Sequence, residues 1–412
     1  MKKQKNSTKS NTTEKVKAMP RATGDLSIVI LVLALCIFGI VMVFSASYYF
    51  SISETGSPYS YLKRQLMWFG LGLVSMFIFS KIDYHFWGNF GIMFYLAGLA
   101  LLILVLIPGV GSGTAGATRW ILIGPITIMP GEIAKITLIF CLAALLAKYQ
   151  NLVRNFKGLV MVLLITGVYA ALILEQPNMS TAVTVVLIAG GMILVAGAKI
   201  WQLLLLAGAG AVGGMALILT SEYRRARLFS FMDPFSDSLV NGYQVVQGLL
   251  ALGTGGFTGQ GLGNSIQKYL YLPEPQNVFI LAIIGEELGF VGIIVLMMVY
   301  VLLIWRGCKA AMNAKDYYGM MLAIGITIMI GVQVAINIAV VTSSMPPTGV
   351  ILPFVSYGGN ALLLLMSMMG VLWNVTKQSE KEQFRLIEEN RRKQLEDNSS
   401  REIKRTVRHN AI

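Results

Sequence analysis

Apolar residues occur along this chain in long runs separated by shorter polar segments. Runs of about 17–25 residues match the thickness of the hydrocarbon core of a bilayer, so each predicts a transmembrane helix. The runs cover 27–50, 65–80, 87–108, 131–147, 158–174, 180–198, 201–220, 279–305, 318–342 and 356–376. The pattern therefore predicts an all-α polytopic membrane protein with ten spans.

Composition supports a membrane protein with two polar tails. Hydrophobic residues make up 55% of the 412 residues and charged residues only 13%, which excludes an ordinary soluble globular protein. We expect a basic tail over 1–26, a membrane domain over 27–376 and a charged tail over 377–412. The first apolar run is too long for the hydrophobic part of a signal peptide, so it predicts a retained anchor.

Lysine and arginine are distributed unevenly around the predicted spans. An even number of spans places both tails on one side, and most of the 33 Lys and Arg residues lie in these tails and in loops on the same side. The positive-inside rule therefore predicts that both termini are cytoplasmic. The formal net charge of +13 then reflects topology and attraction to anionic membrane lipids, and not binding to nucleic acid.

Four polar segments fall on the opposite, extracellular side. They cover 111–135, 175–181, about 221–278 and 343–365, the third being a large loop between the seventh and eighth spans. Glycine and proline are frequent in them, so continuous helix is not expected. Irregular backbone near a membrane is tolerated where it lines a polar cavity. Because all four segments converge on one side, they predict a polar cavity that receives a lipid-borne substrate.

Charged side chains in the first segment point to an anionic ligand. The guanidinium of Arg119, beside Trp120, matches phosphate oxygens in shape and charge. Glu132 and Lys135 are three residues apart at the start of a span, so they share a helix face and form either a structural ion pair or part of a polar site. Asn178, in the second segment, belongs either to a simple Pro-Asn turn or to the same site.

Three arginines open the long third segment, where the charge rule predicts few basic residues. Arg224, Arg225 and Arg227 are explained either by capture of an anionic headgroup or pyrophosphate, which we favour, or by snorkelling at the interface. The glycines over 253–263 do not follow a strand of a βαβ unit, so they do not predict a dinucleotide site. We expect them to form a flexible, partly re-entrant segment that lines the polar cavity.

Several of these segments resemble the SEDS family of shape, elongation, division and sporulation proteins, which includes FtsW, RodA and SpoVE. The resemblance covers about 25–376 and rests on "GATRWI", "GQGLGNSIQK", "YLPEPQ", "FILAIIGEELGFVG" and "TGVILPFVSYGG". The sequences of the "GLGNSIQK" and "PEPQ" stretches resemble the FtsW and SpoVE branch more closely than RodA. The ten-span layout of this family agrees with the topology predicted from hydropathy and charge.

The resemblance implies polymerisation of lipid II, with a growing glycan on undecaprenyl pyrophosphate as donor and the 4-hydroxyl of an incoming lipid II sugar as acceptor. This chemistry needs a base for the hydroxyl and positive charge for the pyrophosphate that leaves. The candidates for the pyrophosphate are Arg119, Arg224, Arg225, Arg227 and Lys268. A divalent cation is expected only from the resemblance. The expected partners are a class B penicillin-binding protein, a transpeptidase, and division proteins at the septum of the bacterial cell membrane.

Further site residues are carried over from the motifs that match. These are Trp120, Glu132, Lys135, Asn178, Pro273, Glu286, Glu287, Ser356, Tyr357, Gly358 and Gly359. Acids within a membrane helix are costly and usually have a role, but we expect Glu286 and Glu287 to be architectural rather than to act as the base.

One position departs from the family pattern in a way that affects chemistry. Val278 stands where the resemblance expects an essential Asp, directly before the Phe-Ile that starts the eighth span, and a valine side chain cannot accept a proton. Glu274 lies on the wrong side of the turn, and Glu286 lies about 12 Å further along the helix, so neither replacement is attractive geometrically. Asn178 likewise stands where Asp is usual.

Three functions remain open at this stage. The chain is a polymerase in which Glu274 or Glu286 supplies the base, or a scaffold with impaired catalysis that binds lipid II and a transpeptidase, or a lipid II transporter. Membership of the family favours the polymerase, whereas the valine at position 278 favours low or absent activity.

Overall fold

The computed structural model describes residues 22–112, 118–123, 126–219, 225, 231–235 and 242–409. Arg224 and Arg227 lie outside these residues. The chain divides into two units, one comprising residues 24–379 and the other comprising the two tails, 1–23 and 380–412. The predicted membrane domain, 27–376, lies within the first unit.

Each of the ten predicted spans overlaps a helix of the structure, and the third, 87–108, overlaps both α3 and α4. The helices of the membrane domain are α1 (Leu26–Thr55), α2 (Ser60–Phe79), α3 (His85–Asn89), α4 (Gly91–Leu104), α5 (Pro130–Lys148), α6 (Phe156–Glu175), α7 (Met179–Val195), α8 (Ile200–Leu219), α10 (Tyr243–Gly255), α11 (Ile280–Met312), α12 (Tyr317–Val341) and α13 (Gly359–His409), with a short 3-10 turn η1 (Leu152–Arg154). Seven helices in the described part of the chain are long and apolar enough to cross a membrane, and α4 and α7 are shorter apolar helices. The polytopic helical fold is thus confirmed, while the count of ten spans stays a prediction.

Helix boundaries follow local sequence signals. The side chain of Asp25 caps α1 by accepting a hydrogen bond from the Ser27 amide at 3.0 Å, and Gly56 ends the helix in a left-handed conformation with φ of 71°. Pro130 occupies the first turn of α5, where its missing N–H is not needed. The carboxylate of Asp316 caps α12 through the Gly319 amide at 2.7 Å.

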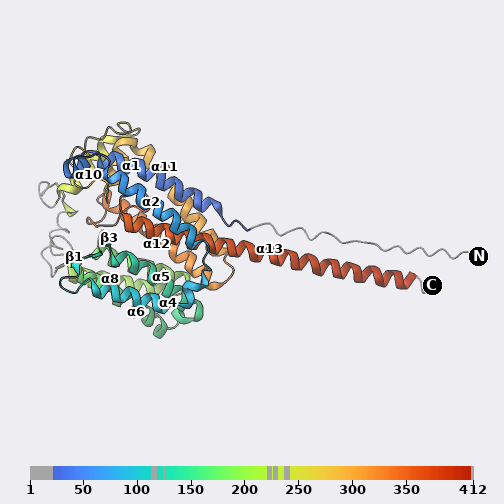
Figure 1. The fold of residues 1–412 in the computed structure, drawn as a ribbon. Helices are drawn as coiled ribbons and strands as arrows, with labels where there is room; N and C mark the ends of the chain where they lie inside the picture. Colours follow the sequence, from blue (N-terminus) through green and yellow to red (C-terminus); the bar gives the residue numbers. More distant parts are fainter. Residues whose placement is uncertain are drawn as a thin grey trace, which may run out of the picture. The chain divides into compact units, whose positions relative to one another are not determined.

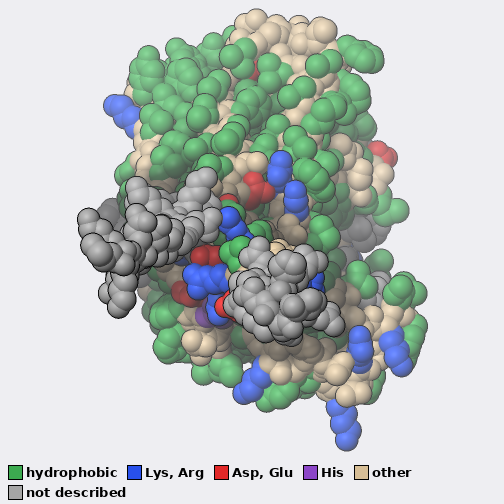
Figure 2. All heavy atoms as spheres, turned by 90° about the vertical axis from the view of Figure 1, so that its right-hand side faces the viewer, with side chains coloured by type: hydrophobic (Ala, Val, Ile, Leu, Met, Phe, Trp, Pro, Cys, Tyr) green, Lys and Arg blue, Asp and Glu red, His purple; other side chains and the backbone are tan. Residues whose placement is uncertain are grey.

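The helices of the membrane domain form two groups joined by α12. In the first group α11 packs against α1 and α10, and α1 packs against α2. In the second group α5 packs against α4 and α7, and α6 packs against α7. Since α12 contacts α11, α5 and α7, it connects the two groups in the middle of the domain (Figure 1). Hydrophobic side chains make up much of the face seen in Figure 2.

A small antiparallel sheet corrects the purely helical prediction. Strands β1 (Gly111–Ser112), β2 (Trp120–Ile123) and β3 (Ile126–Ile128) lie in the order β1-β2-β3, with Ser112 opposite Trp120 and Leu122 opposite Thr127. The β-branched and aromatic residues of this segment favour extended backbone, and the hairpin leads directly into α5. The sheet thereby joins the described parts of the first polar segment to the start of α5.

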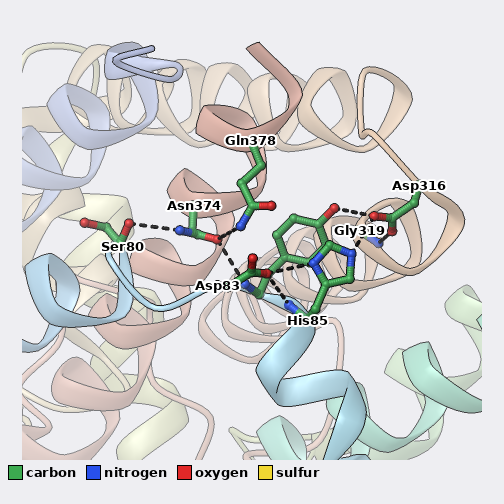
Figure 3. Close-up of polar contacts among 8 residues, drawn as sticks. Ser80, Asp83, His85, Asp316, Gly319, Asn374 and Gln378 are labelled. Atoms are coloured by element: carbon green, nitrogen blue, oxygen red, sulfur yellow. Dashed lines mark hydrogen bonds and ion pairs between the residues drawn. The ribbon is translucent and has the colours of Figure 1, made fainter. Parts of the chain in front are cut away.

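A polar cluster ties three elements together at the predicted cytoplasmic side (Figure 3). The two ring nitrogens of His85 lie 2.7 Å from a carboxylate oxygen of Asp83 and 2.8 Å from one of Asp316. The hydroxyl of Tyr84 donates to Asp316 at 2.5 Å, and the Tyr84 amide donates to the side chain of Asn374 on α13 at 3.0 Å. These contacts join the start of α3 to the first turn of α12 and to α13.

The second unit contains the end of α13, which continues well beyond the predicted last span. Its exposed surface carries ion pairs one helical turn apart, Arg392 with Glu388 at 3.1 Å, Lys393 with Glu389 at 2.9 Å and Arg401 with Asp397 at 3.0 Å. Such pairs stabilise a solvated helix modestly, which agrees with the mixed-charge helical pattern of the sequence.

Candidate functional site

The predicted extracellular segments meet around a polar cavity of about 440 Å³. Its lining comprises Trp68, Arg119, Trp120, Thr127, Met129, Glu132, Asn178, Glu274, Asn277, Val278, Gly349, Ile351, Tyr357, Gly358, Gly359, Asn360 and Ala361. Residues from all four polar segments contribute to this lining, together with Trp68 of α2. The cavity is therefore the strongest candidate site in the described part of the chain.

Glu274 and Val278 line the same cavity. The sequence had predicted that Glu274 lies on the wrong side of the turn to replace the missing Asp. The turn folds back because the Asn277 amide donates to the carbonyl of Glu274 at 3.1 Å and the Asn277 side chain donates to its carboxylate at 2.7 Å. Glu274 has a φ of 45°, the left-handed region that a residue with a Cβ rarely adopts. Such strain at a cavity is typical of functional positions.

The second acid of the lining is neutralised by a neighbour. Glu132 is paired with Lys135 at 2.8 Å, and their side chains are 15% and 6% exposed. The spacing of three residues at the start of α5 produces this pair, as expected, and it also places one carboxylate on the cavity. Glu274 is consequently the acid of the lining that has no basic partner among the described residues.

Arg119 fixes the hairpin to the second extracellular segment. Its guanidinium donates to the carbonyl of Gln176 at 3.4 Å and to the carbonyl of Pro177. Part of its donor capacity is thus used within the protein, while the side chain still lines the cavity beside Trp120. Arg225 is exposed and does not line this cavity.

Asn178 has two roles in the structure. Its side-chain oxygen caps α7 by accepting a hydrogen bond from the Thr181 amide at 3.3 Å. Asn178 also lines the cavity, and the residue is only 3% exposed. Its amide nitrogen is buried and has no hydrogen-bond partner among the described residues, which is costly for the fold.

The segment over 349–361 contributes a second wall of the cavity, next to the Glu274 turn. The amide of Tyr357 donates to the carbonyl of Gln276 at 2.9 Å, which joins the two walls. The hydroxyl of buried Ser356 accepts from the Leu352 amide at 2.9 Å and so shapes the loop rather than the cavity surface. Asn337 of α12 donates to the carbonyls of Val278 and Val350 at 2.9 Å each.

Glycine is required at Gly359 by a close approach. A Cβ placed there would lie 2.1 Å from the indole nitrogen of Trp68, so any larger residue would push this ring away. Trp68 was not among the residues predicted from sequence, because a tryptophan within an apolar run has no signal that separates lipid contact from a site. Gly358 and Gly359 both line the cavity, as the motif predicted.

Several predicted site residues do not line this cavity. Glu286 and Glu287 are fully buried and Lys268 is 3% exposed. Lys268 donates to Glu287 at 3.0 Å and lines a separate cavity of about 330 Å³ with residues of α1 and of the loop before α11. Lys268 is therefore not a ligand of the 440 Å³ cavity, and Pro273 is also absent from its lining, although its carbonyl accepts from Gln244 at 3.2 Å.

The two buried acids instead anchor the loop between α10 and α11. Glu286 accepts hydrogen bonds from the Ser265 hydroxyl at 2.5 Å, the Ile266 amide at 3.0 Å and the Gln267 amide at 3.3 Å. Helix α11 is interrupted at Gly289, where φ is 66°, and backbone carbonyls of the first half accept amides of the loop. The glycine-rich loop is thus held by these acids, and it does not line the 440 Å³ cavity as we had expected.

An apolar cavity adjoins the polar one. It has a volume of about 520 Å³ and is lined by Met67, Trp68, Leu71, Ile128, Met129, Ile133, Asn360, Leu363 and Leu364. Trp68, Met129 and Asn360 belong to both linings, so the two cavities share a rim. A ligand with a polar head and an apolar chain fits this pairing.

The acids around the cavity do not form a metal site. Among the residues that the structure describes, no group of three or more His, Cys, Asp and Glu side chains is arranged to hold a metal ion. The carboxylate of Glu132 is directed to Lys135, which leaves Glu274 as a single acidic ligand. This donor set does not fit a dedicated divalent-cation site, and we derive no step through a metal.

Comparison with known proteins agrees with the sequence motifs. The model of the FtsW, RodA and SpoVE family, described as "Cell cycle protein", matches residues 25–381. Stage V sporulation protein E of Bacillus subtilis is 41% identical over 360 residues, covering 87% of this chain and 98% of that protein. A protein named probable peptidoglycan glycosyltransferase FtsW, from Geobacter sp. strain M18, is 39% identical over 361 residues, covering 87% of this chain and 98% of its own length.

Solved structures show the same fold. A chain from a study described as "Structural coordination of polymerization and crosslinking by a peptidoglycan synthase complex" superposes with a TM-score of 0.73 at 28% identity, covering 86% of this chain and 98% of that chain. The rod shape determining protein RodA of Thermus thermophilus gives a TM-score of 0.65 at 27% identity, covering 86% and 97%. Together with the family match over residues 25–381, these similarities show that the chain belongs to the FtsW, RodA and SpoVE family.

Proposed function

We propose that this chain is a septal peptidoglycan glycosyltransferase that polymerises lipid II into glycan strands during cell division. The observation that carries the proposal is Glu274, an acid without a basic partner among the described residues, on a polar cavity that adjoins an apolar one. Relatives named probable peptidoglycan glycosyltransferase FtsW, similar over nearly their whole length, support the reaction class.

Glu274 supplies the base. Its carboxylate takes the proton of the acceptor 4-hydroxyl while the hydroxyl oxygen attacks the anomeric carbon of the donor sugar. The bond from that carbon to the pyrophosphate breaks, and the leaving pyrophosphate keeps the electron pair. One step with one base inverts the anomeric centre and needs no second carboxylate. The strained turn favours this role because it presents the carboxylate on the cavity instead of to the interior.

The paired cavities explain how a lipid-linked sugar is accommodated. The 440 Å³ cavity carries Arg119 and polar side chains for a sugar and its pyrophosphate, and the 520 Å³ cavity is apolar enough for the first part of a polyprenyl chain. Arg119 adds a positive charge where negative charge develops on the leaving group. Arg224, Arg225 and Arg227, on the long extracellular loop, contribute to capture of the anionic headgroup from the membrane surface.

A class B penicillin-binding protein is the partner that completes this function. The structural similarity to a chain of a peptidoglycan synthase complex that coordinates polymerisation and crosslinking supports such a pairing. The similarity to proteins named FtsW supports placement of the pair at the division septum.

The test is lipid II polymerisation by the purified full-length protein in lipid nanodiscs, alone and with its cognate transpeptidase. The wild type is expected to produce glycan strands, and Glu274→Gln is expected to reduce the initial rate by about 10²–10⁴-fold. Glu389→Gln, the same substitution on the exposed tail, is the matched control and should leave the rate unchanged.

Two results would replace this proposal. If lipid II binds but glycan forms neither with the protein alone nor with its transpeptidase, the chain is a scaffold. Val278 in the cavity wall is the observation that favours this alternative. Counterflow of lipid II across liposomes without polymer would support a transporter.

A further inference from the structure

Helices α1 and α11 pack against each other and are joined by polar contacts at two levels (Figure 1). A guanidinium nitrogen of Arg306 lies 3.4 Å from the carboxylate of Asp25, and the hydroxyl of Ser45 donates to the carboxylate of Glu287 at 2.6 Å. Along α1 the two levels are separated by about 30 Å of helix, and along α11 by about 29 Å. Both lengths match the hydrocarbon core of a bilayer. Because Asp25 lies at the predicted cytoplasmic side, the contact between Ser45 and Glu287 marks the outer boundary of the hydrocarbon.

The cavity of about 330 Å³ lies at this outer boundary, since Ser45 belongs to its lining. One face of α1 forms one side of it, through Val41, Phe44, Ser45, Tyr48 and Tyr49. The loop before α11 forms the other side, through Leu262, Gly263 and Lys268. Val41, one helical turn nearer to the membrane centre than Ser45, is 43% exposed. The cavity is therefore open toward the lipid at its apolar end.

Three aromatic rings of α1 stand at steep angles to one another around this cavity. The rings of Phe44 and Tyr48 meet at 78° with centroids 5.9 Å apart, and those of Tyr48 and Tyr49 meet at 69° with centroids 5.0 Å apart. Aromatic faces arranged in this way attract ammonium groups, because each face carries partial negative charge. In the part of the chain that the structure describes, every cation–π contact lies at other rings, so these three faces carry no cation of the described residues.

The charges beneath the cavity favour a cation over an anion. The amine of Lys268 donates to the Gly263 carbonyl at 2.5 Å, to the Glu287 carboxylate at 3.0 Å and to the Ser45 hydroxyl at 3.2 Å, so its three protons are already used. The neighbouring buried acid, Glu286, accepts from neutral donors among the described residues. Two carboxylates facing one ammonium leave one negative charge uncompensated in this group.

We propose that this cavity binds the ammonium headgroup of phosphatidylethanolamine from the outer leaflet of the membrane. The ammonium lies against the aromatic faces of α1, and the apolar end at Val41 and Leu262 receives the start of the acyl chains. A lipid is favoured over a soluble amine because the cavity lies at the level of the headgroups and is open toward the hydrocarbon. The site is separate from the cavity that contains Glu274 and does not depend on the proposed reaction.

The experiment is native mass spectrometry of the full-length protein in detergent micelles, with dioleoyl phosphatidylethanolamine and dioleoyl phosphatidylglycerol in competition. The two lipids share their acyl chains and their phosphate, but the first carries an ammonium in its headgroup. The wild type is expected to retain phosphatidylethanolamine over phosphatidylglycerol by about 5–10-fold. Tyr48→Phe keeps the ring and should keep this preference, whereas Tyr48→Leu removes the ring and should reduce it to about twofold or less.

Tyr149→Leu, the same substitution at an exposed tyrosine outside the cavity, is the matched control and should show the wild-type preference. Tyr49→Leu removes a different wall and is expected to reduce the preference in the same way, which keeps the test decisive if Tyr48→Leu does not fold. Equal retention of the two lipids by the wild type would overturn the site and leave the rings as an ordinary interfacial belt. A wild-type preference in both leucine variants would overturn it as well. Free ethanolamine that displaces the lipid at an equal concentration would contradict a lipid ligand.

Discussion

Two acidic regions lie twelve residues apart in the sequence and are built in opposite ways. Glu274 is exposed, sits in a left-handed turn with φ of 45°, and receives a hydrogen bond from one side chain, that of Asn277. Glu286 is fully buried and accepts from two neighbouring hydroxyls and two amides at 3.3 Å or less. A carboxylate that fixed donors surround stabilises structure, whereas one that is presented on a cavity can exchange a proton with a substrate. The difference agrees with an anchoring role for Glu286 and with the proposal that Glu274 is the base.

The largest expected effect on stability is at the ion pair beside Glu286. Lys268→Met leaves the buried carboxylate of Glu287 without its cation, so the free energy of unfolding should fall by about 3–5 kcal/mol. The double variant Lys268→Met with Glu287→Leu removes both charges and should recover most of that loss. Thermal and denaturant unfolding in nanodiscs measure both variants. A single variant as stable as the wild type would contradict the anchoring role.

Glu286→Gln tests the anchor itself. The amide keeps the shape of the carboxylate but replaces one acceptor oxygen by a donor that faces the Ser265 hydroxyl or the loop amides. We expect the free energy of unfolding to fall by about 1–3 kcal/mol. Hydrogen exchange should increase over the loop between α10 and α11 and remain unchanged at the polar cluster of Asp83, Tyr84, His85 and Asp316. Protection that stays at the wild-type level in this loop would show that Glu286 does not hold it.

Glu274→Gly separates strain from chemistry in the other region. Glycine adopts a φ of 45° without cost, so the variant should be as stable as the wild type or more stable by about 1 kcal/mol. Lipid II polymerisation should nevertheless be lost, since the base is removed. Unfolding and activity are measured on the same preparation. A variant that is less stable by more than about 1 kcal/mol would mean that Glu274 serves the fold.

The smallest expected effect lies at the polar cluster of Asp83, Tyr84, His85 and Asp316. Burial raises the pKa of Asp316, but hydrogen bonds from the Gly319 amide, Tyr84 and His85 outweigh it, so the pKa lies below its ordinary value. A depressed carboxylate pKa stabilises the fold above the unfolded-state pKa of about 3.9, and this contribution is lost as the pH falls through the lower folded-state pKa.

Asp316→Asn should therefore lower the unfolding midpoint near pH 7 by a few degrees, since the cluster is partly exposed and contributes about 1 kcal/mol or less. The difference from the wild type should shrink as the pH is lowered below about 4. A difference that stays constant from pH 7 to pH 3 would contradict the assignment.

The sequence alone predicted the helices and the convergence of the polar segments, because hydropathy and charge are local properties of the chain. It did not place Glu274 on the cavity, because the direction of that side chain depends on a left-handed turn closed by Asn277. It also grouped Lys268 with the pyrophosphate ligands, since only the tertiary fold brings Glu287 and Ser45 to its amine. Trp68 was missed for the same reason, because its contact with Gly359 joins α2 to α13.

The central claim is that a carboxylate on the wall formed by Glu274 and Val278 removes the proton of the acceptor hydroxyl. The most direct measurement is the initial rate of lipid II polymerisation by Glu274→Gln and by the same chain carrying Val278→Asp in addition. The account predicts that the first variant is slower by about 10²–10⁴-fold and that the added carboxylate restores a large part of the rate. A Glu274→Gln protein that is folded and polymerises lipid II at the wild-type rate would contradict it.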